Sequence, residues 1–246
     1  MNIMYNFILL ICSIFSFILS ETCAEEKPIF YEDFSKGMEN WWVEGGEKVW
    51  VENGRLMVKA NPQKGEKGYS VCTIWYKKKL HGNLQVEFDA HVVSSDIDVN
   101  NINFFFLYSD PSNKPLYDTR KNRQTAKYKL YHQLNGYIFT FVNDRDGKFG
   151  RYPDGSTKAR IRIRRCPGFK LLTESYGYHC CQGKTYHIII TRHDKTLSIS
   201  VDGKMYLEAE DKAPLSEGLL GLRTYRTNLW CDNIKVKRVG QMKIKE

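Results

Sequence analysis

The chain has 246 residues, seven cysteines and a formal net charge of +9. A chain of this length can bury a full hydrophobic core, so it does not depend on disulfides for stability. The positive charge suggests a polyanionic partner, and nucleic acid is the common choice for such a chain. The N-terminus indicates that the chain is exported. Export disfavours nucleic acid as the partner and favours an anionic polysaccharide. The alternative is a basic surface that is simply solvated.

An N-terminal apolar segment predicts export. Residues 7–19 are apolar, but a helix that spans a bilayer needs about 20 residues. Thr22-Cys23-Ala24 then forms a cleavage site before Glu25. We interpret residues 1–24 as a signal peptide and residues 25–246 as one domain, since no linker or repeat divides them. The expected product is periplasmic or secreted, with no membrane attachment after cleavage; a retained anchor is the alternative.

Strand patterns follow one another along the whole mature chain, and helical periodicity is nearly absent. A first strand near residues 29–34 is expected to pair with the last one. Asn53-Gly54 predicts a hairpin between residues 49–52 and 55–58, and Asp202-Gly203 predicts another between 197–201 and 204–207. The other expected strands are 71–76, 84–93, 101–108, 137–143, 159–165, 184–192, 218–224 and 229–238.

Alternation along these strands assigns side chains to faces. In strand 84–93, apolar residues share one face, and Glu87 and Asp89 share the other. In strand 101–108, Asn103 lies opposite the phenylalanines of the core. In strand 159–165 the isoleucines point inward, and a row of arginines lies outside: Arg160, Arg162 and Arg164. Strand 137–143 is apolar on both faces, so the pattern leaves the side of Tyr137 open.

Two long loops, residues 109–127 and 166–183, are candidate binding loops. Five cysteines remain after the predicted cleavage: Cys72, Cys166, Cys180, Cys181 and Cys231. An odd number leaves at least one free thiol. A bridge from Cys166 to Cys180 or Cys181 would close the second loop, but the spacing leaves the pairing open.

The C-terminal segments TYHIIITRHDKTLSISVDGK, GLLGLRT and CDNIKV resemble the concanavalin A-like lectin/glucanase superfamily, whose two-sheet jelly roll is shared with laminin-G-like domains. The segments FYEDFSKGMENWWVEGG, YHQLNGYIFTF and ARIRIRRCPGF are similar to uncharacterised bacterial families related to a protein of rhamnogalacturonan utilisation operons. The resemblance covers nearly the whole mature chain. It implies an all-β, two-sheet antiparallel β-sandwich with a carbohydrate ligand on its concave sheet.

One set of residues has the chemistry of a polysaccharide lyase. Arginine and amide side chains neutralise a uronate carboxylate, and histidine or tyrosine transfers the proton. The catalytic candidates are His132, Tyr137 and Arg162. The substrate-binding candidates on the same face are Asn103, Asn135, Arg164 and Arg223. The alternative is a solvated strand face on which His132 caps a loop.

Glu87 and Asp89 partly resemble the carboxylate strand of retaining glucanases, whose two carboxylates lie about 5 Å apart. The second glutamate of that motif is missing, because the strand runs into His91-Val92-Val93. Tyr225 beside Arg223 adds an aromatic ring that could stack on a sugar. We expect no cofactor and no catalytic metal, although Asp96, Asp98 and Asn100 offer oxygen ligands for a structural calcium ion.

The sequence therefore predicts an exported protein that binds, and degrades by β-elimination, an anionic poly- or oligosaccharide. A glycoside hydrolase of the same fold and a non-catalytic carbohydrate-binding module are the first alternatives. A laminin-G-like adhesion domain with a protein partner is the third. No serine-nucleophile motif or phosphate-binding glycine loop is present, which disfavours nucleotide-dependent chemistry.

Overall fold

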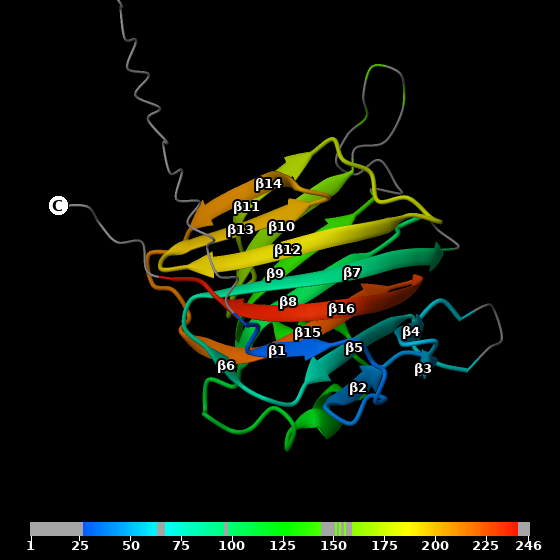
Figure 1. Cartoon of the computed structure of the whole chain (residues 1–246), viewed down its shortest axis with the longest axis horizontal. Coiled ribbons are helices and arrows are strands. Elements are labelled where there is room, and N and C mark those ends of the chain that lie inside the picture. The colour runs from blue at the N-terminus through cyan, green and yellow to red at the C-terminus, as the bar shows by residue number, and fades with distance from the viewer. Residues whose placement is uncertain are drawn as a thin grey trace, which may run out of the picture.

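The computed structural model describes residues 27–62, 67–95, 98–143, 151, 153, 155 and 159–240. Within them the chain forms two antiparallel sheets, so the predicted all-β sandwich is confirmed. Figure 1 shows the sheets as stacked layers, with β7, β12 and β16 in the nearer one and β8, β9 and β15 behind. The predicted signal segment, residues 1–24, lies outside the described residues, and none of the described helices is long and apolar enough to cross a membrane.

The first sheet joins the two ends of the described chain. Its order is β14-β13-β12-β7-β16-β4-β3, and β1 pairs with β16 as predicted for the first and last strands. Its strands are β1 (Phe30–Glu32), β3 (Lys48–Glu52), β4 (Arg55–Lys59), β7 (Leu84–Ser94), β12 (Thr185–His193), β13 (Thr196–Val201), β14 (Lys204–Glu210) and β16 (Asn228–Arg238).

The second sheet carries the arginine strand. Its order is β11-β10-β9-β8-β15-β5-β2, and β6 pairs with β15. Its strands are β2 (Trp41–Gly45), β5 (Val71–Tyr76), β6 (Leu80–His81), β8 (Ile102–Ser109), β9 (Asn135–Val142), β10 (Arg160–Cys166), β11 (Lys170–Tyr176) and β15 (Glu217–Tyr225).

Both predicted hairpins form, because their turn residues tolerate positive φ. Asn53 and Gly54 have φ of 51° and 70° between β3 and β4. Asp202 and Gly203 have φ of 50° and 79° between β13 and β14. These are the backbone angles that a two-residue hairpin loop of this kind requires.

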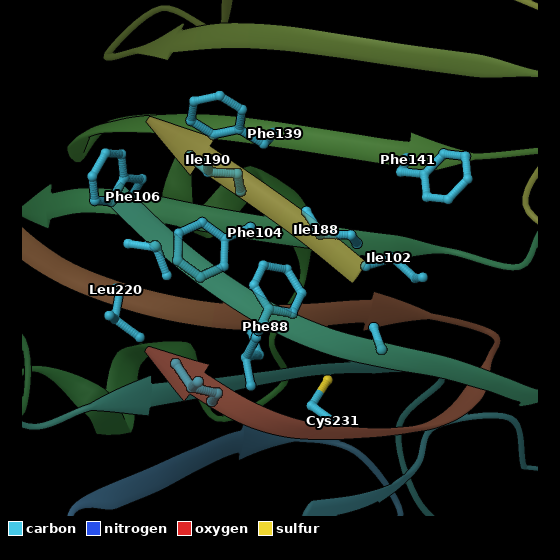
Figure 2. Packing of buried hydrophobic residues seen from close by; sticks show 14 of the residues in the cluster. Phe88, Ile102, Phe104, Phe106, Phe139, Phe141, Ile188, Ile190, Leu220 and Cys231 are labelled. Atoms are coloured by element: carbon cyan, nitrogen blue, oxygen red, sulfur yellow. The ribbon is translucent and has the colours of Figure 1, made fainter. Parts of the chain in front are cut away.

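The core lies between the two sheets and contains the inward residues that alternation predicted. Figure 2 shows its aromatic centre, where Phe88 of β7 meets Phe104 of β8, with ring centroids 5.3 Å apart. Tyr137 and Phe139 of β9 also belong to this core. The second apolar cluster, around Trp75, Phe105 and Tyr131, covers the other side of the second sheet. The core therefore fixes which side of each strand faces outward.

The two predicted loops differ from expectation. The first contains a short 3-10 helix, η1 (Arg120–Arg123), and is followed by a second, η2 (Tyr128–Tyr131). The second loop is not structureless, because β11 lies within it and pairs with β10. The possible Cys166 bridge is not formed, since all five cysteines of the described residues are free thiols.

Candidate functional site

A row of polar side chains crosses the outer face of the second sheet. Consecutive strands are paired so that each residue lies beside the next, and inward neighbours such as Ile161 and Ile163 hold the row on the outside. From β2 to β11 this polar row consists of Glu44, Thr73, Arg223, Asn103, Thr140, Arg162 and Glu174.

The first half of the polar row is covered by residues 109–134, and Glu44 holds this covering segment in place. The buried Glu44 carboxylate forms an ion pair with Arg123 at 3.0 Å and accepts a hydrogen bond from the Tyr131 hydroxyl at 2.7 Å. It also accepts bonds from Trp42 Nε1 at 3.3 Å and Trp75 Nε1 at 3.0 Å. These donors compensate the cost of burying the carboxylate. Because Arg123 and Tyr131 belong to the covering segment and Glu44 to β2, the same contacts anchor the segment to the sheet.

Arg223 belongs to the covered half of the polar row, where it links the sheet to the covering segment. Its guanidinium donates to Thr73 Oγ1 at 2.7 Å and to the carbonyl of Ala126 at 2.9 Å, and it lies over the rings of Tyr128 and Tyr131. The residue is only 4% exposed. Arg223 was predicted to bind substrate, and this burial beneath the covering segment contradicts direct contact with a polysaccharide.

The second half of the polar row has polar atoms that lack partners. Asn103 donates to Asn101 Oδ1 at 2.8 Å, but its own Oδ1 accepts no hydrogen bond. The Nε of Arg162 is likewise buried without a partner, and Thr140 beside it lies close enough to the Tyr128 hydroxyl to lower the pKa of Tyr128, which burial raises. Buried polar groups are normally hydrogen-bonded, and leaving one unpaired costs about 1–3 kcal/mol. Asn103 and Thr140 are only 6% and 2% exposed, so the half-buried arginines of β10 form the accessible part of this half.

Positive charge and aromatic rings border this half. Arg160 and Arg164 extend on either side of Arg162 along β10, and Glu174 of β11 is the acidic residue opposite. Arg164 donates to the carbonyl of Phe169 at 2.9 Å and lies 4.2 Å from the Phe169 ring centroid. These three arginines are half-buried rather than enclosed, so their charge reaches the surface.

The charge states follow from burial. Burial lowers the pKa of Arg162, and the neighbouring Arg164 lowers it further, while burial lowers the pKa of Arg160 to about 10. Both stay cationic at neutral pH. Burial, followed by Arg223, Arg164 and Lys129, lowers the pKa of His132. Its ring is therefore neutral at pH 7, and its Nε2 has no partner.

His132 lies on the covering segment at the border of the polar row. Its ring stacks on Phe169 at 4.0 Å between centroids, and the Tyr128 ring meets it edge-on at 4.8 Å. The Tyr128 hydroxyl is buried, which raises the pKa of Tyr128, and Arg162 and Thr140 lie close enough to lower this pKa in part. His132 and Tyr128 thus accompany Arg164 and Arg162 on one side of the sheet.

The structure separates Tyr137 and Asn135 from these residues. Tyr137 lies on the inner face of β9, where its hydroxyl donates to Asp211 Oδ2 at 2.6 Å and accepts from the Leu215 N–H at 2.8 Å. The predicted position of Tyr137 on the ligand face is therefore wrong. Asn135 lies at the start of β9, where Nδ2 donates to Ser109 Oγ at 3.3 Å. Tyr225 lies at the end of β15 with an exposed ring.

Glu87 and Asp89 lie on the other side of the molecule. They are on the outer face of β7 in the first sheet, so they cannot share a ligand with the arginines of the second sheet. Asp89 accepts from His187 Nδ1 at 2.9 Å and from Asn233 Nδ2 at 2.8 Å. Glu87 lies 3.5 Å from Lys237. Glu87 and Asp89, predicted as a separate pair of substrate-binding candidates, are thus on a different sheet from the arginines, and both carboxylates have partners.

The structure describes only two of the three predicted calcium ligands, Asp98 and Asn100. Asp96 lies outside the described residues, and Asp98 accepts from Asn100 Nδ2 at 2.6 Å. Within the described part of the chain, no three His, Cys, Asp or Glu side chains are grouped as a metal site. The structural calcium ion stays a prediction.

Sequence reasoning missed Tyr128, Thr140 and Glu174. Thr140 is a small polar residue in a strand that is apolar on both sides, and only the pairing of β8, β9 and β10 places it between Asn103 and Arg162. Its polarity within that apolar run is the one signal that could have identified it.

Comparisons with known proteins concern the fold and the family. A family model described as "Domain of unknown function (DUF6250)" matches residues 65–234. A search of the curated proteins found no match. A protein of unknown function with a galectin-like fold from Bacillus subtilis has a TM-score of 0.70 at 15% identity, covering 87% of this chain and 97% of its own.

The names of two further similar structures include a carbohydrate ligand or a carbohydrate-binding role. The carbohydrate binding module CBM66 from Bacillus subtilis has a TM-score of 0.51 at 15% identity, covering 80% of this chain and 95% of its own. The VIP36 exoplasmic/lumenal domain in its Ca²⁺/Man-bound form has a TM-score of 0.55 at 7% identity, covering 84% and 86%. At these identities the likeness concerns the fold, and it confirms the predicted lectin-like jelly roll.

Proposed function

The chain belongs to the family described as Domain of unknown function (DUF6250), and we propose that it binds an acidic poly- or oligosaccharide. The proposed site is the accessible end of the polar row, formed by the half-buried Arg160, Arg162 and Arg164 of β10, with the buried Asn103 and Thr140 beside it. The observation that carries the proposal is the row of three half-buried arginines on one outer sheet face, with the Phe169 ring beside Arg164.

The side chains of the site suit a sugar. Sugar hydroxyl and carboxylate oxygens accept hydrogen bonds, and the half-buried guanidinium groups of Arg160, Arg162 and Arg164 supply donors. The Phe169 ring, held between His132 and Arg164, supplies an apolar surface nearby. Two proteins of similar fold, a carbohydrate binding module and a lumenal domain with bound mannose, support the same class of ligand.

The charge of the site favours an acidic sugar over a neutral one. Arg160, Arg162 and Arg164 face a single carboxylate, that of Glu174, across β11. A guanidinium binds a carboxylate through two parallel hydrogen bonds, which suits a uronate better than a hydroxyl. Such a ligand also agrees with the predicted export, since acidic polysaccharides occur outside cells, and it needs neither nucleic acid nor a membrane.

The experiment compares an oligogalacturonate with a neutral oligosaccharide of equal length, by calorimetric titration of the wild type, Arg162→Ala and Arg55→Ala. Arg55 removes the same charge from the opposite sheet, where it lies over the Trp230 ring. We expect Arg162→Ala to weaken oligogalacturonate binding by roughly 10–100-fold, the effect of a lost hydrogen bond to a charged group. Equal weakening by Arg55→Ala would leave only a general charge effect and reject the site.

β-Elimination is the second candidate function, and His132 is the observation that favours it. Its neutral ring could take the proton from C5 of a uronate whose carboxylate is held by Arg164 or Arg162. The C4–O bond then breaks, a C4=C5 double bond forms, and the leaving oxygen takes a proton from the Tyr128 hydroxyl or from water. Tyr137, the proton donor predicted from sequence, faces the core and takes no part.

The two candidates differ in their products. Under the lyase proposal, oligogalacturonate develops the ultraviolet absorbance of an unsaturated uronate, and His132→Ala abolishes it while leaving binding within about threefold. The binding proposal alone predicts saturable binding with no new absorbance and no new reducing ends. New reducing ends without that absorbance would instead indicate a glycoside hydrolase.

A further inference from the structure

A separate cavity of about 290 Å³ lies near the other edge of the second sheet. It is lined by Trp42 of β2, by Leu219 of β15 and by the start of the covering segment, including Leu116 and Tyr117. β2 and β11 form opposite ends of the sheet order, so this cavity and the arginines of β10 lie on different parts of the same layer. Its volume is at the lower end of the roughly 300–1,000 Å³ of small-molecule sites.

Two aromatic rings form rigid walls of this cavity. Trp42 is held by its bond to Glu44 and by stacking on Trp75, with centroids 6.0 Å apart. Tyr117 meets Trp42 at 81° with centroids 5.4 Å apart, and Arg120 lies 3.8 Å from the centroid of Tyr117 while donating to its carbonyl at 2.7 Å. The two rings therefore meet at nearly a right angle; Tyr117 is 43% exposed and supplies most of the accessible surface, while Trp42 is 7% exposed and lines the floor of the cavity.

The charged groups at the cavity leave an excess of positive charge. Lys79 pairs with Glu217 at 2.8 Å, and Asp110 accepts from the backbone N–H and the hydroxyl of Ser112. Lys77 donates to a backbone carbonyl, and neither Lys77 nor Lys114 forms an ion pair with a described residue. Lys114 lies near Asp110, whose pKa is lowered by the Ser112 hydrogen bonds and by Lys114. The three lysines of the lining therefore exceed its two carboxylates by one positive charge, and Lys77 is the lysine without a carboxylate partner among the described residues.

We propose that this cavity binds one acidic sugar unit. The sugar ring packs on Trp42 and Tyr117, whose faces suit its C–H groups, and its carboxylate meets Lys77 and Lys114. Leu116 and Leu219 exclude water from the apolar side of the ring. The site is independent of the polar row, and it does not require that the row bind any ligand.

The test follows the indole N–H signal of Trp42 by NMR while glucuronate, glucose or sodium sulfate is added to the full chain. We expect glucuronate to shift this signal saturably, glucose to bind more weakly, and sulfate to leave it in place because sulfate cannot pack on the rings. Sulfate producing the same shift as glucuronate would reduce the site to a simple anion contact and overturn the proposal. No shift with glucuronate would overturn it as well.

The variants separate this cavity from the polar row. Tyr117→Ala is expected to weaken glucuronate binding about two- to tenfold, and Lys114→Ala about two- to fivefold. Tyr225→Ala removes an equally exposed tyrosine at the end of β15 and should change nothing. Arg162→Ala should also leave the Trp42 titration unchanged. Loss of the Trp42 shift in Arg162→Ala, with Tyr117→Ala and Lys114→Ala binding normally, would place the ligand on the polar row and refute the cavity site.

Discussion

Replacing Glu44 by glutamine tests whether this one carboxylate holds the covering segment on the sheet. In the native protein it accepts hydrogen bonds from Trp42, Trp75, Arg123 and Tyr131. Glutamine keeps the shape but removes the charge opposite Arg123, and it turns an amide N–H₂ toward groups that are themselves donors. The substitution therefore breaks a buried ion pair and leaves donors without acceptors.

Removing one member of a buried ion pair costs about 3–5 kcal/mol, because the other charge remains buried and uncompensated. For a chain of this size, each kcal/mol lowers the melting temperature by about 2–4 °C, so we expect a drop of about 6–20 °C. Urea unfolding followed by tryptophan fluorescence measures the change directly, since two of the donors are indoles.

Glu217→Gln is the matched control. It removes a carboxylate that also pairs with a cation, Lys79, but both side chains are about half exposed. Exposed pairs contribute about 0–1 kcal/mol, so its melting temperature should stay near that of the wild type. If Glu44→Gln were no less stable than Glu217→Gln, the covering segment would be held by apolar packing alone, and the role assigned to Glu44 would be wrong.

Three further predictions concern the inner face and the cysteines. Tyr137→Phe should lower the free energy of unfolding by about 1–3 kcal/mol, because Asp211 and the Leu215 N–H lose their partner, and should leave oligogalacturonate binding unchanged. Burial alone would raise the pKa of Asp211, but its hydrogen bonds and Arg165 lower the pKa overall. The stability that the Asp211 carboxylate contributes is therefore present above its unfolded pKa and is lost below about pH 4. Acid titration should destabilise the wild type more than Asp211→Asn. Iodoacetamide should alkylate exposed Cys181 alone among the described cysteines before unfolding, since burial raises the pKa of thiols such as Cys180 well above its usual value; early alkylation of Cys180, detected by peptide mass spectrometry, would contradict this.

The strands and their faces could be predicted wherever turn residues and alternation are strong. Asn53-Gly54 and Asp202-Gly203 fixed two hairpins, and the pattern of β7 placed Phe88 in the core and Asp89 outside it. The edge strand β11 gave no such pattern, because its side chains are mostly half-buried or exposed on both faces. The inner position of Tyr137 was equally hidden, since β9 is apolar on both sides and contributes to both clusters.

Asn103, Arg162 and Arg223 were predicted to share one face, but their order in the polar row and its other members could not be predicted, for a different reason. Asn103, Thr140, Arg162 and Arg223 are neighbours only through strand pairing, and pairing between strands so far apart along the chain is not encoded in any local pattern. The sequence supplied the arginine side of β10, but it did not show which arginines a covering segment would enclose. Arg223 and Arg162 have the same chemistry and the same sheet face, yet only one remains near the surface.

The covering segment is therefore what divides this sheet into distinct sites. By enclosing Glu44, Thr73 and Arg223, it makes half of a continuous polar row part of the protein interior, and it leaves Arg162 half-buried, where we propose that the ligand binds. The start of the same segment brings Tyr117 against Trp42 and so forms the second cavity. Because one anchor holds the whole segment, weakening Glu44 should disturb the Trp42 cavity more than the Arg162 site, whose strands β8, β9 and β10 pair independently of it.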